Sequence, residues 1–316
     1  MKIRVKKAML IVILLCVGGC TTQNEAVNDE KSLYFLYAAP LVDHPIWLQS
    51  KDGFFKACEE LDVKCEWLGP KVIDTEKMEE VITQGMYQKA DGIITQGVIR
   101  KELLDELSQQ KIPAILVDSN VQEADKLIYY GKNFHTQAQL LLDEIEKTLG
   151  KDTKLIIGIQ VAEMNFKIAV DQIEEIRNVF KNHPGGFEIV STTESKSDKV
   201  KAQSEWLSVF RKHPEINVSI NFAAESAEAC GELVQTLNLN DKVHIYGVDD
   251  METTIEYIKK GWIDASVVTS FYQYGYKSVY RLYDYITSGK QPAKNEQIKL
   301  LIVNKDNVNS YKDELK

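Results

Sequence analysis

The sequence predicts an α/β fold of two lobes, each built on a doubly wound parallel sheet. From Leu33 onward, short apolar runs rich in β-favouring residues alternate with longer segments of helical periodicity. This alternation is typical of βαβ units, whose helices cover both faces of a parallel sheet. The same rhythm starts again after Asn133, and no Gly/Ser-rich linker separates the two modules. Two lobes of matched size, joined through a hinge, are therefore expected.

The first module contains five predicted strands and three predicted helices. Asp91-Gly92 opens the third strand and Pro113 precedes the fourth, where residues that favour turns belong. The predicted strands are residues 33–38, 64–68, 92–95, 114–117 and 126–130, and the predicted helices are residues 46–61, 75–89 and 100–110.

The second module repeats the pattern and ends with one extra helix and strand. Its predicted strands are residues 154–160, 187–192, 218–222, 243–248 and 265–268. Its predicted helices are residues 136–149, 169–182, 200–212, 227–237 and 252–260, followed by a helix at 272–288 and a strand near 297–303. Two sheets of about five strands each are implied.

The first residues predict export. Basic residues, among them Lys2 and Arg4, precede an apolar run from Ala8 to Val17 that is too short for a bilayer core, so residues 1–19 are expected to be a signal peptide. Val17-Gly18-Gly19-Cys20 is similar to the bacterial lipobox, which implies that Cys20 carries a lipid on the outer face of the cell membrane. An ordinary secretory peptide with a nearby cysteine is the alternative. Residues 20–32 are expected to form a flexible tether.

Charge and cysteine content narrow the function classes. Of 38 Lys and Arg residues the leader holds four, so 34 remain against 47 Asp and Glu, a net charge of −13 that disfavours nucleic acid as a partner. Cys58, Cys65 and Cys230 lie in the body, an odd count that cannot pair completely. Buried free thiols are the favoured interpretation, with a Cys58–Cys65 bridge as the alternative. No Cys/His spacing predicts a metal site, and no cofactor is expected.

Ligands in open α/β sheets bind beyond the carboxyl ends of the strands. Two such sheets that face one another create a cleft lined by loops from both lobes. The cleft is therefore where functional residues are sought.

Three segments resemble the type I periplasmic binding proteins, with ribose-binding protein as the nearest subfamily. They are Asp43-His44-Pro45-Ile46-Trp47, Leu116-Val117-Asp118-Ser119 and Tyr246-Gly247-Val248-Asp249-Asp250. The resemblance extends over about residues 33–304. It implies three crossings between the lobes, near residues 131–134, 269–271 and 298–301, and hence a three-stranded hinge. The N-terminal lobe would then be residues 33–132 plus 271–298, and the C-terminal lobe residues 133–270 plus 299–316.

A sugar site needs carboxylates and amides around the hydroxyls and an aromatic platform against the ring face. Trp47 stands where the ribose-binding pattern has a stacking ring, although it could instead pack against its own lobe. Asp118 and Asp249 hold the family's two strand-end aspartate positions. The resemblance implies a ligand-binding set of Asp43, His44, Trp47, Asp118, Ser119, Lys167, Glu225, Asp249, Thr269 and Phe271.

Several positions depart from the ribose-binding pattern. Glu225 replaces an asparagine, Thr269 a glutamine and Ser197 a phenylalanine. No arginine occurs at Ser119 or across residues 165–171, where the pattern has two; Lys167 could supply a cation there or be a solvated helix charge. An acidic cleft without a compensating cation could suit an amine-bearing ligand.

The expected function is capture of a small polar ligand, a sugar, by a monomer that catalyses nothing. The expected partner is the permease of an ATP-driven (ABC) importer, or alternatively a membrane sensor histidine kinase; a non-sugar solute is a further alternative. An enzyme is disfavoured because the sequence has no Gly-x-Ser-x-Gly, His-Glu-x-x-His or phosphate-binding Gly-rich motif. A transcriptional regulator of this fold would need a DNA-binding headpiece where this chain has an export signal.

Overall fold

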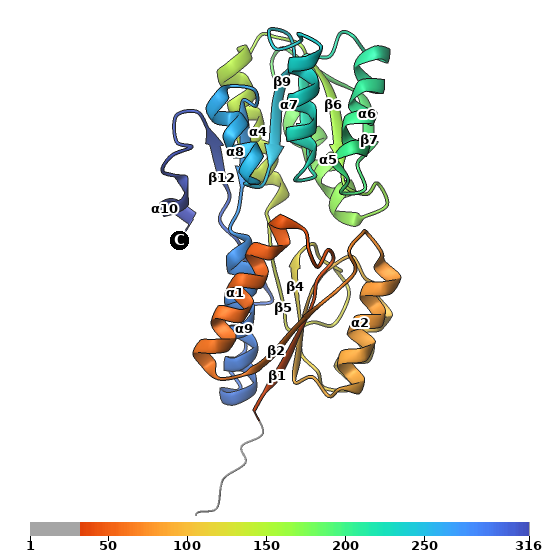
Figure 1. Ribbon diagram of the computed structural model, residues 1–316, viewed down its shortest axis with the longest axis vertical. Coiled ribbons are helices and arrows are strands. Elements are labelled where there is room, and N and C mark those ends of the chain that lie inside the picture. Colours follow the sequence, from red (N-terminus) through yellow and green to blue (C-terminus); the bar gives the residue numbers. More distant parts are fainter. Residues whose placement is uncertain (1–31, 316) are drawn as a thin grey trace, which may run out of the picture. The chain divides into compact units, whose positions relative to one another are not determined.

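The computed structural model describes residues 32–315, which form one compact unit with two α/β lobes (Figure 1). This confirms the predicted fold class. The predicted signal peptide, Cys20 and almost all of the predicted tether lie outside the described residues.

The first lobe is built on a sheet of six strands in the order β2-β1-β3-β4-β5-β11, all parallel. Its strands are β1 (Tyr34–Ala38), β2 (Lys64–Leu68), β3 (Gly92–Gln96), β4 (Ala114–Asp118), β5 (Ile128–Gly131) and β11 (Asn295–Gln297). Alternate residues of β1 face opposite layers: Phe35 and Tyr37 pack toward α1 (Pro45–Leu61) and α9 (Phe271–Ser288). Tyr34 and Leu36 pack toward α2 (Thr75–Tyr87) and α3 (Lys101–Gln109).

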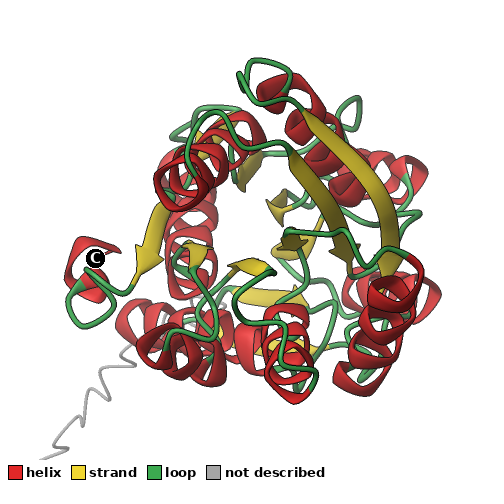
Figure 2. Ribbon diagram, turned by 90° about the horizontal axis from the view of Figure 1, so that it is seen from above, coloured by secondary structure: helices red, strands yellow, loops and turns green. Residues whose placement is uncertain are grey.

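The second lobe repeats this order as β7-β6-β8-β9-β10-β12, with β12 antiparallel to β10. Its strands are β6 (Leu155–Val161), β7 (Phe187–Glu194), β8 (Val218–Asn221), β9 (His244–Val248), β10 (Ala265–Val268) and β12 (Leu301–Asn304). Its helices are α4 (Phe134–Leu149), α5 (Lys167–Phe180), α6 (Lys199–Lys212), α7 (Ser226–Thr236), α8 (Glu252–Lys260) and α10 (Tyr311–Leu315). Helices flank the strands on both sides (Figure 2).

The chain passes between the two sheets three times, at residues 132–133, 269–270 and 298–300. The prediction of a single strand near residues 297–303 was wrong, because the last passage lies within this segment. That segment forms β11 in the first sheet and β12 in the second, because residues 298–300 cross between them. Each sheet therefore has six strands instead of about five.

Helix starts follow ordinary capping chemistry. The side chain of Asp74 accepts a hydrogen bond from the backbone N–H of Lys77 at the start of α2, and Asn133 does the same for Thr136 at the start of α4. Such caps satisfy backbone donors that the first helical turn leaves unpaired.

Cys58 and Cys65 form a disulfide, so the favoured prediction of free thiols was wrong for this pair. Helix α1 ends at Leu61, the next residue Asp62 reverses the chain with a φ of 52°, and β2 begins two residues after Asp62. The reversal brings the two Cα atoms to 6.4 Å, within the range that a disulfide spans. Cys230 is a buried free thiol.

Candidate functional site

A cleft of about 830 Å³, counted with the part that opens to solvent, lies at the carboxyl ends of the strands of both sheets. In each sheet the strand order reverses beside the first strand, β1 or β6, and ligands of doubly wound folds bind at such a point. The cleft draws residues from both lobes. They include Leu41, His44, Trp47, Asp74, Gln96, Asp118, Lys132, Glu163, Phe166, Gln172, Phe222, Glu225, Asp249 and Phe271.

Trp47 and Phe271 form an aromatic wall on the first-lobe side of the cleft. Trp47 lies in the first turn of α1, and Phe271 is the first residue of α9. Their rings meet edge to face with centroids 5.2 Å apart, a favourable arrangement. Trp47 is only 5% exposed, so it both packs against its own lobe and lines the cleft.

Asp118 and Asp249 lie at equivalent places in the two lobes. Asp118 ends β4 and Asp249 directly follows β9. Both adopt left-handed backbone conformations, with φ of 62° and 65°, which are uncommon for residues other than glycine and tend to occur at functional sites.

Hydrogen bonds hold these two backbones in place. The Tyr129 hydroxyl donates to the Asp118 carbonyl at 2.9 Å, and the Ser266 hydroxyl donates to the Asp249 carbonyl at 2.7 Å. The side-chain amide of Gln96, at the end of β3, donates to the Asp118 carboxylate at 2.8 Å. These contacts fix both backbones and the Asp118 carboxylate at the cleft.

Lys132 joins the two aspartates. It lies in the first passage between the lobes, and its Nζ is 2.9 Å from Asp118 Oδ1 and 3.5 Å from Asp249 Oδ1. Its side chain is 5% exposed, and Nζ lies 5.2 Å from the centre of the Phe271 ring. Burial alone would lower the pKa of Lys132, but the two carboxylates outweigh burial and hold that pKa above its ordinary value. Lys132 is therefore a buried ammonium.

Sequence reasoning missed Lys132 because it looked for guanidinium groups only at the positions of the ribose-binding pattern. A usable signal was present: a lysine directly after the end of β5, at the point where the chain leaves the first sheet. The sequence left open an acidic cleft without clear cationic partners, which could suit an amine-bearing ligand; Lys132 supplies a cation in that cleft.

Glu225 and His44 face each other across the cleft. His44 caps α1, where its Nδ1 accepts a hydrogen bond from the backbone N–H of Ile46 at 3.4 Å, and its Nε2 lies 3.9 Å from Glu225 Oε2. The Ser195 hydroxyl donates to the other oxygen of Glu225. Burial raises the pKa of Glu225 and lowers the pKa of His44, so burial disfavours charge on both side chains.

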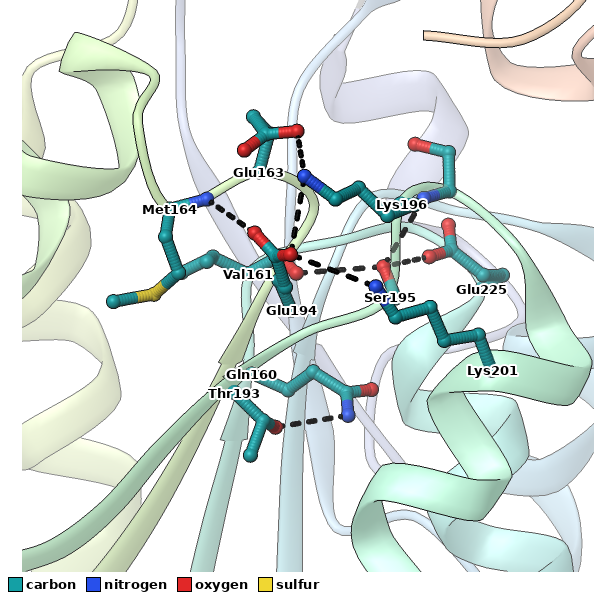
Figure 3. Close-up of polar contacts among 11 residues, drawn as sticks. Gln160, Val161, Glu163, Met164, Thr193, Glu194, Ser195, Lys196, Lys201 and Glu225 are labelled. Atoms are coloured by element: carbon teal, nitrogen blue, oxygen red, sulfur yellow. Dashed lines mark hydrogen bonds and ion pairs between the residues drawn. The ribbon is translucent and has the colours of Figure 1, made fainter.

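The second-lobe rim of the cleft is tied together by charged groups (Figure 3). Lys196 pairs with Glu163, which lines the cleft, and with Glu194 at 3.0 Å. The backbone N–H of Met164 also donates to Glu194, so these contacts join the loop after β6 to the end of β7. The Lys196 ammonium at the rim is therefore already paired with carboxylates of its own lobe.

Four of the ten predicted ligand residues do not line the cleft. Asp43 points outward and pairs with Lys71 at 3.1 Å, and Lys167 is a solvated helix charge that pairs with Asp171 at 2.6 Å. The Ser119 hydroxyl is buried and donates to the Gly97 carbonyl, while the Thr269 hydroxyl donates to the Lys299 carbonyl. The other six, His44, Trp47, Asp118, Glu225, Asp249 and Phe271, come together in the cleft.

Within residues 32–315, no cluster of three or more His, Cys, Asp or Glu side chains is placed to hold a metal ion. No helix in that part of the chain has the length and apolarity that crossing a membrane requires.

Comparison with known proteins gives consistent results. Residues 35–291 match the model of a family described as the periplasmic binding protein domain. The xylose/arabinose-binding protein XylF of Sulfolobus acidocaldarius is 23% identical over 281 residues, which are 83% of this chain and 68% of XylF. The glucose-galactose binding protein GanP of Geobacillus stearothermophilus aligns with a TM-score of 0.81 at 23% identity, covering 88% of this chain and 99% of GanP. A chain from the XylFII-LytSN complex aligns with a TM-score of 0.80 at 24% identity, covering 87% and 98% of the two chains.

Proposed function

This chain belongs to the periplasmic binding protein domain family, and from this premise we propose that it captures a monosaccharide in the cleft and delivers it to an ABC importer. The observation that carries the proposal is the make-up of the cleft. Two strand-end carboxylates, one from each lobe, lie in the same cleft as the aromatic wall of Trp47 and Phe271. Carboxylates accept hydrogen bonds from sugar hydroxyls, and an aromatic ring packs against the weakly apolar face of a sugar ring.

Closure of the lobes is the proposed mechanism. Asp118 and Asp249 belong to different lobes, and the Lys132 Nζ lies 2.9 Å and 3.5 Å from their carboxylates, so the lobes in this structure already present both carboxylates to one ligand. A ligand that contacts both lobes in this arrangement favours it over one in which the lobes are farther apart. A ligand with this differential affinity shifts the population toward the closed form. The outer surface changes with closure, and a membrane partner can recognise that change.

The names of similar proteins support a sugar as the ligand. XylF is named for xylose and arabinose, and GanP for glucose and galactose. The complex of XylFII with LytSN favours a second candidate, in which the closed form signals to a sensor histidine kinase instead of an importer. Co-purification from crosslinked membranes, with and without sugar, separates the candidates, because the captured partner is then either a permease or a kinase.

The test of sugar binding is a thermal-shift panel of neutral pentoses, neutral hexoses and polyols. A ligand of the native state raises the melting temperature by mass action, and a thousandfold excess over Kd adds about 4 kcal/mol of stability. Trp47→Ala should remove most of the shift because it deletes the aromatic ring, and Asp118→Asn because it removes the negative charge and exchanges one acceptor oxygen for an NH2 donor. Tyr87→Ala and Asp306→Asn alter exposed side chains outside the cleft and serve as matched controls. Undiminished shifts in both cleft variants would reject this site.

Anchoring at Cys20 is part of the same proposal. The family works outside the cytoplasm, and a lipid on Cys20 would keep the protein beside its membrane partner. Cells grown with labelled palmitate should incorporate label into the wild-type protein and not into Cys20→Ser. Equal labelling of the two proteins would contradict the anchor.

A further inference from the structure

The charge balance of the cleft depends on one residue. Among the described residues that line the cleft, Lys132 is the only lysine or arginine, whereas the acids Asp74, Asp118, Glu163, Glu225 and Asp249 all line it. Glu163 is matched by Lys196 at the rim. The Lys132 ammonium, 2.9 Å and 3.5 Å from its two carboxylates, is therefore the cation that serves both strand-end aspartates.

Removing such a cation from a buried site is costly for the carboxylates that remain. A buried carboxylate without a partner either takes up a proton or attracts another cation. Asp118 is 5% exposed and Asp249 is 6% exposed, so water can screen neither charge effectively. The position of Nζ is thus one that a ligand's amine would occupy if Lys132 were absent.

We propose that Lys132 determines the charge class of the ligand: its ammonium occupies the cation position between Asp118 and Asp249, so that the cleft accepts neutral sugars and rejects amino sugars. The inference rests on the proposed sugar-binding function. The Lys132 ammonium forms ion pairs with both carboxylates, at 2.9 Å and 3.5 Å, and its three N–H donors include at least one for a sugar oxygen. A protonated amino sugar meets a resident positive charge instead of a free carboxylate.

The first test compares neutral and amine-bearing sugars on the same variant. Calorimetric Kd values are measured for D-glucose, D-glucosamine, D-galactose and D-galactosamine with wild-type protein and Lys132→Met. We expect the amino-to-neutral affinity ratio to rise at least tenfold in the variant. An unchanged ratio overturns the inference. Wild-type protein that binds no sugar in the thermal-shift panel overturns the proposed function instead.

A second test needs no sugar. Lys132→Ala leaves a cavity that opens to the cleft, and n-propylammonium chloride should restore its melting temperature by at least half of the loss relative to equimolar sodium chloride. Lys199→Ala is the matched control, because Lys199 also bridges two carboxylates, Glu228 at 3.4 Å and Glu232 at 2.9 Å, but lies outside the cleft. Equal responses of the two variants, or no response of Lys132→Ala, contradict the assigned role.

Where Lys132→Met or Lys132→Ala does not fold, the cation is removed in an Asp249→Asn background. In the Asp249→Asn protein the Lys132 ammonium pairs with the Asp118 carboxylate alone, and replacing Lys132 then leaves that carboxylate without its cation. The double variant should prefer amino sugars over neutral sugars at least tenfold more than Asp249→Asn alone. The same preference in both proteins overturns the inference.

Discussion

At the scale of single residues, Asp249 shows how the cleft balances burial against charge. Burial raises the pKa of its carboxyl to about 6, the attraction of Lys132 opposes that rise, and the neighbouring charge of Asp118 adds to it. Because the folded-state pKa exceeds the ordinary value, the folded protein binds this proton more tightly than the unfolded chain does. The associated stability is fully present below the ordinary pKa and is lost as the pH rises through about 6.

Comparison with Asp249→Asn isolates this effect. The amide resembles the protonated acid, so the two proteins should be closest in unfolding free energy at pH 4. Between pH 4 and pH 7 the unfolding free energy of the variant should rise relative to that of wild type by on the order of 2 kcal/mol, because only the wild-type side chain becomes a buried charge. Urea denaturation across this pH range measures the difference. Parallel stability curves would show that Asp249 does not titrate in this way.

The sequence predicted correctly that a side chain lines the cleft where the end of a strand determines the position of that residue. Asp118 ends one apolar strand and Asp249 directly follows another, and such residues reach the ligand-binding edge of a parallel sheet. The prediction failed where orientation depends on tertiary contacts. Asp43 is adjacent to His44, yet only His44 turns into the cleft, and the pairing of Asp43 with Lys71 depends on a loop that local sequence does not determine.

At the scale of elements, the close contact of α1 with α9 joins the start of the first lobe to a helix more than 200 residues later (Figure 1). A glycine on each helix permits it. A Cβ on Gly53 would lie 2.1 Å from the Tyr272 carbonyl oxygen, and a Cβ on Gly275 would lie 2.0 Å from the Ser50 carbonyl oxygen. Both distances are far below any real Cβ contact, so neither position has room for a side chain.

Gly275→Ala should therefore destabilise the protein although alanine favours helices. Forcing the two backbones apart costs about 1–3 kcal/mol, as overpacking does elsewhere. Gly231→Ala in α7 is the control: its added Cβ meets nothing nearer than 3.5 Å. The control should gain up to about 1 kcal/mol from helix propensity. Chemical denaturation compares the two, and equal stabilisation would contradict the packing account.

Element boundaries that depend on distant partners were the least predictable from the sequence. The segment at residues 297–303 is a continuous β-favouring pattern, yet it serves two sheets because its middle crosses between lobes. The Cys58–Cys65 bridge likewise depends on the left-handed turn at Asp62, and an aspartate alone does not reveal that turn.

At the scale of the whole molecule, the repeated βαβ rhythm was sufficient to predict two lobes, because the periodicity of a parallel sheet buried on both faces is strong. The equivalent strand orders of the two sheets place Asp118 and Asp249 at corresponding edges. The passage at Lys132 adds the cation between them, which periodicity alone does not indicate. The cleft is thus a product of both lobes and the connection that joins them.

The most direct test of the central claim is a crystal structure of the protein with the sugar that gives the largest thermal shift. The account predicts sugar hydroxyls within hydrogen-bond distance of the carboxylates of both Asp118 and Asp249, and the ring face against Trp47. A sugar bound outside the cleft, or one that contacts a single lobe, would contradict it.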